Sequence, residues 1–153
     1  MATAFKQPEP AFVVRSADDL PDLYAMNGKG NCMSPLYEDG VCLAFSKTAP
    51  VRAGDTVIVW FKPEHKRGEY QCLFKRLVSL PPVEFLDRLS KAVDPDALGD
   101  VEPLVILEML NPPKRLAFPF SHILAMHRCI GEAESQADGR AKVRHDLIEE
   151  AAR

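Results

Sequence analysis

The chain lacks most features that mark a membrane, secreted or nucleic-acid-binding protein. No stretch approaches the roughly 20 apolar residues needed to cross a bilayer. No apolar run follows the lysine near the N-terminus, so a secretory signal is not expected. The net charge of −3 over 153 residues provides no basic surface for phosphate groups. We therefore expect a cytoplasmic protein without direct nucleic-acid binding, in which any action at DNA depends on a partner or a separate segment.

Closely paired cysteines are also missing. The four cysteines stand at positions 32, 42, 72 and 129, and none forms the Cys-x-x-Cys pair of a zinc knuckle. His122 and His127 are five residues apart, a spacing that does not place both on one helical face. The pattern favours reduced cytosolic thiols. It predicts neither a metal site nor a cofactor.

Short apolar runs, separated by turn residues, are what the sequence contains in place of long helices. No pair of amphipathic helices is visible, so a helix-turn-helix is not expected. The runs predict a mainly β domain of antiparallel strands with little helix. The expected strands are residues 12–14, 41–46, 56–62, 69–79, 104–110 and 123–130, and a short helical pattern lies within residues 83–100.

The chain length suits one domain, which we place at residues 24–131. Prolines and aspartates interrupt residues 1–23, so this part is expected to be an extended N-terminal arm. Residues 132–153 are polar and are expected to form a peripheral C-terminal tail, either as a charged helix or frayed.

The segment between Gly30 and Gly40 contains a candidate nucleophile. Ser34 followed by Pro35 suits an N-cap and the first helical position, which predicts a single helical turn. Cys32 would then precede a helical N-terminus, where free backbone N–H groups can stabilise a thiolate or a developing oxyanion. The alternative, which this segment by itself favours, is a buried structural cysteine beside a tight turn.

Lys75 is a candidate base in a second segment. Strand alternation places it on one face with Leu73 and Leu77, so its neighbours on that face are predicted to be apolar. Burial disfavours the charged ammonium, and a lysine in such a setting can activate an adjacent nucleophile. The alternative is an edge-strand lysine that extends past the leucines into water.

Together the two segments resemble the catalytic domain shared by LexA, UmuD and phage repressors, and more distantly type I signal peptidases. The family pattern Gly-Asp-Ser-Met-x-Pro corresponds to residues 30–35, here Gly-Asn-Cys-Met-Ser-Pro. Its Asp-Gly and Gly-Asp turns, its Val-Lys-Arg, its Asn-Pro turn and its closing strand with a glycine correspond to residues 39–41, 53–59, 74–77, 111–112 and 123–131.

The resemblance implies a bent, mostly antiparallel β fold in which a lysine takes the proton of a serine, and the serine attacks a peptide in the same chain. Carried over, Cys32 is the nucleophile and Lys75 is the general base. Asn31 and Met33 flank the oxyanion site and the substrate groove. The resemblance also implies a homodimer, a protein or peptide partner, and a role in transcription regulation of the repressor or SOS-response type, including that of phages.

The chain departs from this pattern at three points. Cysteine replaces the nucleophilic serine, Asn31 and Val41 replace two aspartates, and no Ala-Gly or Cys-Gly cleavage pair precedes Cys32. Three interpretations therefore stay open. The chain is a regulatory and dimerisation module without normal self-cleavage, an active Cys32/Lys75 peptidase cutting in trans or in a segment outside this chain, or an unrelated small β domain.

Two structural expectations follow. An intact dyad would place Cys32 and Lys75 about 3 to 4 Å apart, with Lys75 buried and no carboxylate beside it. A homodimer would bury one sheet edge, for which residues 123–130 or the C-terminal tail are the expected contributors.

Overall fold

The computed structural model describes residues 2–6, 13–81 and 103–152. Within these ranges the chain is mainly β, as predicted, with ten strands, three 3-10 helices and one short α-helix. None of the helices in these ranges is long and apolar enough to cross a membrane. The helical pattern expected within residues 83–100 lies outside the described residues.

The strands and helices follow one another along the chain with short connections. In order, they are β1 (Ala2–Lys6), η1 (Ala17–Asp19), β2 (Leu23–Asn27), β3 (Cys42–Ser46), β4 (Thr56–Phe61), η2 (Pro63–His65), β5 (Cys72–Ser79), β6 (Leu104–Leu110), β7 (Pro113–Pro119), η4 (Phe120–His122), β8 (Ile123–Glu132), β9 (Glu134–Ser135), β10 (Arg140–Arg144) and α2 (His145–Ala151).

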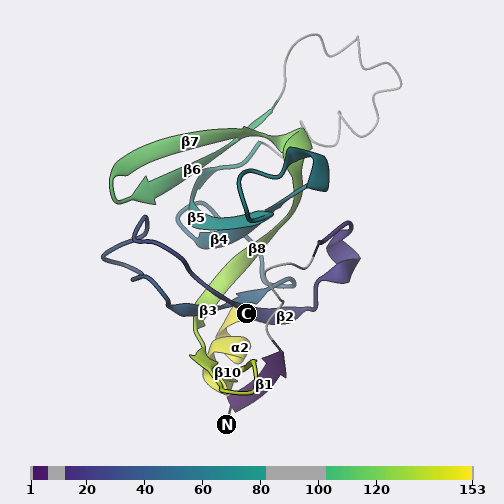
Figure 1. Cartoon of the computed structure of the whole chain (residues 1–153), viewed down its shortest axis with the longest axis vertical. Coiled ribbons are helices and arrows are strands. Elements are labelled where there is room, and N and C mark those ends of the chain that lie inside the picture. The colour runs from purple at the N-terminus through teal and green to yellow at the C-terminus, as the bar shows by residue number, and fades with distance from the viewer. Residues whose placement is uncertain (1, 7–12, 82–102, 153) are drawn as a thin grey trace.

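Seven strands form one antiparallel sheet in the order β2-β3-β8-β4-β5-β6-β7. The long strand β8 joins the two halves of this sheet, because its first part pairs with β4 and its last part pairs with β3. Figure 1 shows β8 running from the upper strands down to β3. Since β8 is hydrogen-bonded on both sides, the expectation that residues 123–130 offer a dimer edge is wrong.

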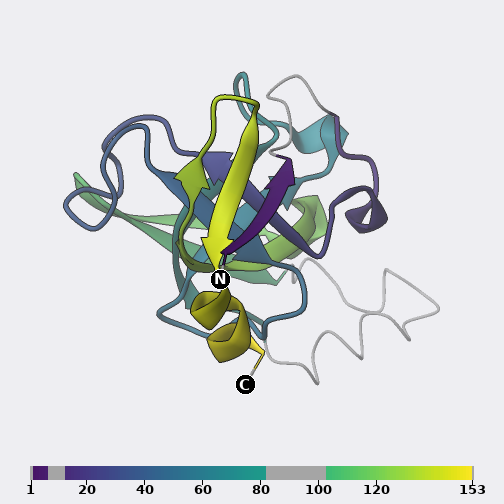
Figure 2. The same cartoon turned by 90° about the horizontal axis from the view of Figure 1, so that it is seen from below.

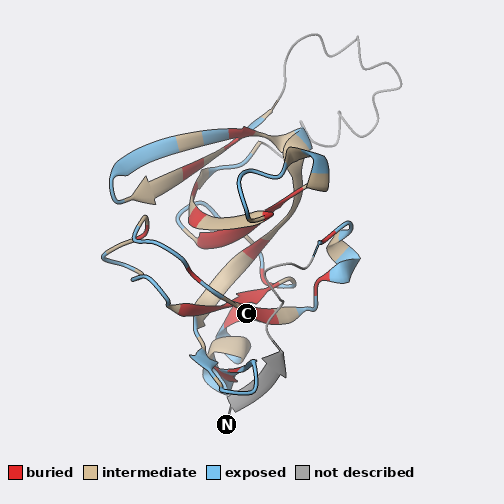
Figure 3. Cartoon of the chain, in the orientation of Figure 1, coloured by how far each residue is buried: buried red, intermediate tan, exposed pale blue. Residues whose placement is uncertain are grey.

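The hydrophobic core lies on both faces of β4, whose six residues are all buried. Ile58 and Trp60 pack into one cluster with Tyr24 and Phe45. The alternate residues of β4 pack into a second cluster, with Leu77 of β5. Figure 3 shows this buried band through the middle of the sheet. Burial on both faces explains why β4 reads as an uninterrupted apolar run instead of an alternating one.

Five of the predicted strands are present as β3, β4, β5, β6 and β8, with ends shifted by a few residues. The strand predicted at 12–14 is wrong at Val13 and Val14, which belong to no strand, and Phe12 lies outside the described residues. The reason is Gln71, whose buried side chain bonds both the N–H and the C=O of Val14. A side-chain amide thus takes the place of a neighbouring strand.

The C-terminal segment is more structured than its polar composition predicted. It forms β9, β10 and α2, and β10 pairs with β1 from Ala2↔Arg144 to Lys6↔Arg140. Ala141 and Val143 of β10 are fully buried. Figure 2 shows β1 and β10 side by side, with α2 following β10. The two ends of the chain therefore form one small three-stranded sheet.

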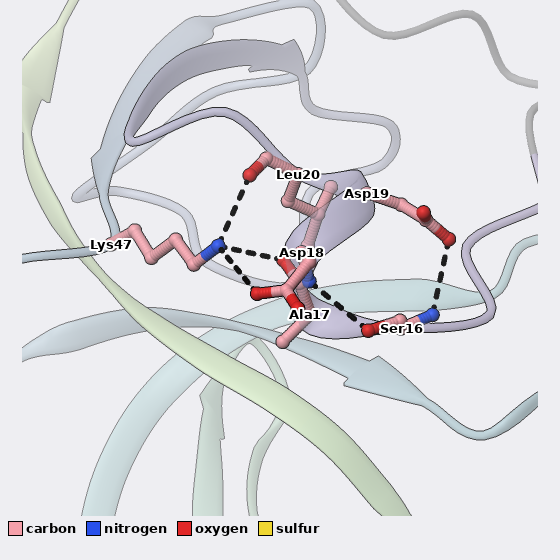
Figure 4. A network of polar contacts seen from close by, with 6 residues as sticks. All are labelled: Ser16, Ala17, Asp18, Asp19, Leu20 and Lys47. Atoms are coloured by element: carbon pink, nitrogen blue, oxygen red, sulfur yellow. Dashed lines mark hydrogen bonds and ion pairs between the residues drawn. The ribbon is translucent and has the colours of Figure 1, made fainter.

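The N-terminal segment is fastened to the end of β3 by Lys47. Its Nζ donates to the carbonyl oxygens of Ala17 (2.8 Å) and Leu20 (3.3 Å), which are free at the end of η1. It also lies 3.9 Å from the carboxylate of Asp18 (Figure 4). Ser16 caps the other end of η1. These contacts hold the chain next to the β2–β3 hairpin, whose long loop carries the candidate site.

Candidate functional site

Cys32 and Lys75 meet in the structure although 43 positions separate them in the sequence. Lys75 Nζ lies 2.9 Å from Cys32 Sγ, within hydrogen-bond distance. Cys32 stands in the loop that joins β2 to β3, and Lys75 stands in the middle of β5. The contact lies at the short end of the range expected for an intact dyad.

Lys75 is buried, with 8% of its surface exposed. It pairs across the sheet with Val57, and Leu73 and Leu77 pack into the same core cluster as Val57. The alternative of a lysine extending into water is therefore wrong. Its Nζ makes one further contact, with the carbonyl of Phe74 at 3.3 Å. Among the described residues no carboxylate forms an ion pair with Lys75, so Cys32 is its one acidic neighbour there.

Strand β6 brings the Cys32 loop to this position. β5 and β6 pair from Arg76↔Glu108 onward toward Ser79, and the pairing does not continue to Lys75. Instead, the last residue of β6 turns to the loop. The N–H groups of Leu110 and Asn111 donate to the carbonyl oxygen of Cys32 at 2.9 and 3.0 Å. The loop thus sits where β6 separates from β5, beside Lys75.

The Cys32 loop is also held closed at its base. The N–H of Gly28 donates to the carbonyl of Val41 (2.8 Å), and the N–H of Gly40 donates to the carbonyl of Gly28 (3.0 Å). Gly28 is pressed against the ring of Phe74, since a Cβ at this position would lie 2.3 Å from Phe74 Cζ. The absence of a side chain at residue 28 therefore lets the loop approach β5 beside Lys75.

The single helical turn predicted from Ser34 and Pro35 is not present. Residues 32–36 form turns instead, in which the N–H of Ser34 donates to the carbonyl of Asn31 (3.0 Å). The Ser34 hydroxyl donates to the carboxylate of Glu38 at 3.0 Å, so it is not used as an N-cap. The dipole of a helix N-terminus therefore contributes nothing at Cys32.

The two residues predicted to flank the site have different surroundings. Met33 has 1% of its surface exposed, so its side chain belongs to the packing beneath the loop. The exposed Asn31 uses Oδ1 to accept the N–H of Asp39 (3.3 Å), and Asp39 Oδ1 in turn accepts the N–H of Gly30 (2.7 Å). Neither the Cys32 nor the Met33 N–H donates to any described residue.

The three other cysteines have surroundings that keep the thiol protonated. Burial raises the pKa of Cys72 to about 12 and also raises the pKa of Cys42 and Cys129. Cys32 is partly exposed and touches a lysine nitrogen. The four thiols thus divide into three inert ones and one in contact with a proton acceptor.

Sequence reasoning missed the contribution of Leu110, Asn111 and Asp39 to the site. The Asn-Pro turn was visible as a turn at residues 111–112, but nothing in the sequence indicates which loop it contacts. Asp39 was visible as part of an Asp-Gly turn. Its bond to Gly30 depends on how the whole loop folds back.

No family model, no curated protein and no solved structure matches this chain. Assignment of a function therefore depends on the geometry of the site itself.

Proposed function

We propose that this protein is a Cys/Lys-dyad peptidase of the LexA-like type, with Cys32 as nucleophile and Lys75 as general base. The observation that supports this most is the 2.9 Å contact of Lys75 Nζ with Cys32 Sγ, made by a buried lysine with no described carboxylate partner. A carboxylate beside Lys75 would hold it as an ammonium and remove its capacity as a base.

The reaction begins with transfer of the thiol proton from Sγ to Nζ. The thiolate attacks the carbonyl carbon of a peptide bond, a C–S bond forms, and the carbonyl oxygen becomes an oxyanion. When this intermediate collapses, the C–N bond breaks and the Lys75 ammonium gives its proton to the leaving amine. Water then attacks the thioester while Lys75 takes a proton from it, and the carboxylic acid is released with Cys32 restored.

The oxyanion needs hydrogen-bond donors, and the loop has two to offer. The N–H groups of Cys32 and Met33 have no acceptor among the described residues. A peptide carbonyl placed against Cys32 Sγ could accept from both, as in the oxyanion holes of other acyl-transfer enzymes. Of the two residues predicted for the oxyanion site, Met33 supplies a backbone group in this proposal, and Asn31 holds the loop through its side chain.

The substrate is a peptide from elsewhere than the first 31 residues of this chain. No Ala-Gly or Cys-Gly pair precedes Cys32, and the glycines ahead of it, Gly28 and Gly30, stand inside the loop that carries the nucleophile. Cleavage in trans, or of a segment outside this chain, fits this arrangement.

A mixture of quenched-fluorescent peptides tests the proposal. We expect wild-type protein to cleave members of the mixture and Cys32→Ala to lose all cleavage. Lys75→Met should lower the rate by about a hundredfold or more, the usual contribution of a general base. Arg76→Met, the neighbouring cation on the other face of β5, is the matched control and should keep the wild-type rate. Cleavage that survives in Cys32→Ala, or a wild type without cleavage, contradicts the proposal.

A second candidate function is a regulatory and dimerisation module of the repressor type, without chemistry. It is favoured by the missing cleavage pair and by the strands at the edges of the larger described sheet, β2 and β7, whose outer sides could pair with a second copy. Sedimentation at tens of micromolar tests the homodimer. A monomer at that concentration, together with peptide cleavage, leaves the peptidase as the single account.

A further inference from the structure

Both peptide groups that flank Cys32 have their carbonyl oxygens tied to one hairpin. The Cys32 carbonyl accepts the N–H groups of Leu110 (2.9 Å) and Asn111 (3.0 Å) at the β6–β7 turn. The carbonyl of Asn31, the preceding residue, accepts Nδ2–H of Asn111 at 3.3 Å. Asn111 therefore contacts the two consecutive carbonyls on either side of the nucleophile.

These contacts fix the direction of two N–H groups. The Asn31–Cys32 and Cys32–Met33 peptide bonds are both trans. In a planar trans peptide group the C=O and the N–H point in opposite directions. Because the carbonyls of Asn31 and Cys32 point to the hairpin, the N–H groups of Cys32 and Met33 point away from it. Neither N–H has an acceptor among the described residues.

We propose that Asn111 is a positioning residue that pre-orients the oxyanion hole of the Cys32/Lys75 site from the β6–β7 turn. The inference rests on the proposed function, because an oxyanion hole matters only if Cys32 attacks a carbonyl. Donors that are already oriented stabilise the developing oxyanion without reorganisation during the reaction. The Asn111 side chain adds the hold on Asn31, and thereby sets the direction of the Cys32 N–H.

The role differs from holding the thiol. Lys75 contacts Sγ from β5, whereas Asn111 contacts only backbone carbonyls. Loss of the Asn111 amide therefore leaves the Cys32–Lys75 contact in place and frees the Asn31–Cys32 peptide group to rotate. A reaction of Cys32 that forms no oxyanion should not depend on Asn111.

Two reagents separate these effects in the full chain. Iodoacetamide reacts by displacement of iodide at a tetrahedral carbon, so the thiolate forms a C–S bond with no oxyanion. 4-Nitrophenyl acetate acylates the thiolate through an oxyanion and releases 4-nitrophenolate. The two rates are measured for wild type, Asn111→Ala, Asn111→Asp and the control Lys114→Ala, an exposed residue of β7 in the same hairpin.

We expect both Asn111 variants to lose about 10- to 100-fold in acylation rate, somewhat less than the loss of a whole oxyanion donor. Their alkylation rates should stay within about twofold of wild type, and Lys114→Ala should change neither rate. Labelling of Cys42, Cys72 and Cys129 reports unfolding, since these thiols are protected by burial in the native chain. Asn111→Asp keeps the size of the side chain if Asn111→Ala unfolds.

Acylation and alkylation that fall in parallel would overturn the inference, because the turn would then hold the nucleophile and not the N–H groups. Unchanged acylation in both variants would overturn it as well. Each of these results leaves the proposed function standing. A wild-type Cys32 that 4-nitrophenyl acetate does not acylate overturns the proposed function, and this inference with it.

Discussion

Tyr24, Trp60 and His127 form one cluster of hydrogen-bonded side chains in this fold, and Cys32 and Lys75 form another. In the first cluster Trp60 Nε1–H donates to Tyr24 Oη (2.9 Å), and Tyr24 Oη lies 2.7 Å from His127 Nδ1. All three side chains are almost fully buried. Each polar atom in these two bonds has its partner, so the cluster has no group left to offer a ligand.

The Cys32–Lys75 cluster differs in just this respect. Cys32 is partly exposed, and two backbone N–H groups beside it have no described acceptor. A fully matched and buried polar cluster stabilises one conformation, whereas a cluster with an exposed nucleophile and free donors can bind and react. The two regions therefore predict opposite consequences of mutation. Changes in the first should affect stability, and changes in the second should affect reactivity.

The largest loss of stability is expected for Tyr24→Phe. The substitution leaves the buried Trp60 N–H and His127 Nδ1 without the hydroxyl that joins them, and each orphaned group costs about 1–3 kcal/mol. Chemical denaturation should show a decrease of about 2–4 kcal/mol in the free energy of unfolding. The alkylation rate of Cys32 should not change, and a change at both places would break the contrast between the clusters.

His127 should make stability depend on pH. Burial, followed by the positive charge of Lys47, lowers the pKa of His127 from 6.5 to about 4 in the folded chain. Between these values the unfolded chain binds more protons, so stability is complete above pH 6.5 and is lost as the pH falls toward 4. The loss should be on the order of 2 kcal/mol. Denaturation at pH 7 and pH 4.5 measures it, and His127→Gln should flatten the difference.

Gly28→Ala should affect both regions, because the loop packs on the strand that carries Lys75. The added Cβ would lie 2.3 Å from the Phe74 ring, and Phe74 also packs against the first core cluster. We expect a loss of about 1–3 kcal/mol from overpacking. Iodoacetamide labelling should show slower alkylation of Cys32 as the loop is displaced. Unchanged reactivity would mean that the loop does not depend on this close approach.

The smallest effect is expected for Arg76→Ala, next to Lys75 in sequence. Arg76 Nη1 lies 3.5 Å from Glu108 Oε1, and both side chains are partly exposed. Such pairs contribute about 0.5 kcal/mol or less. Both the unfolding free energy and the Cys32 alkylation rate should stay near wild type. A large effect on alkylation would show that the charge of β5 as a whole, and not Lys75 alone, controls the thiol.

The sequence predicted elements well where one strand face alternates or a whole strand is buried. The apolar neighbours of Lys75 follow from alternation within β5, and β4 follows from its continuous apolar run. β7 was missed because a proline stands at each end, which suits an edge strand and hides it from pattern analysis. β10 carried a usable signal, since Ala141 and Val143 alternate with charged residues.

What no local pattern could supply is the meeting of distant segments. The contact of Asn111 with the Cys32 loop spans 79 positions from Cys32 and depends on β6 separating from β5 after Glu108. The bonds between Gln71 and Val14 likewise join positions that are 57 apart. Such contacts are set by sheet topology, in which strand order differs from chain order. The Cys32–Lys75 pairing was expected from the family resemblance and not from the local sequence.

The central claim is that Lys75 activates Cys32, and the second-order rate of Cys32 alkylation by iodoacetamide at pH 7 tests it most directly. Mass spectrometry assigns the label among the four cysteines of wild type and Lys75→Met. We predict that Cys32 reacts at least about tenfold faster in wild type, because the lysine accepts its proton and stabilises the thiolate. Cys72 should stay unlabelled in both. Equal rates at Cys32 in the two proteins would contradict the account.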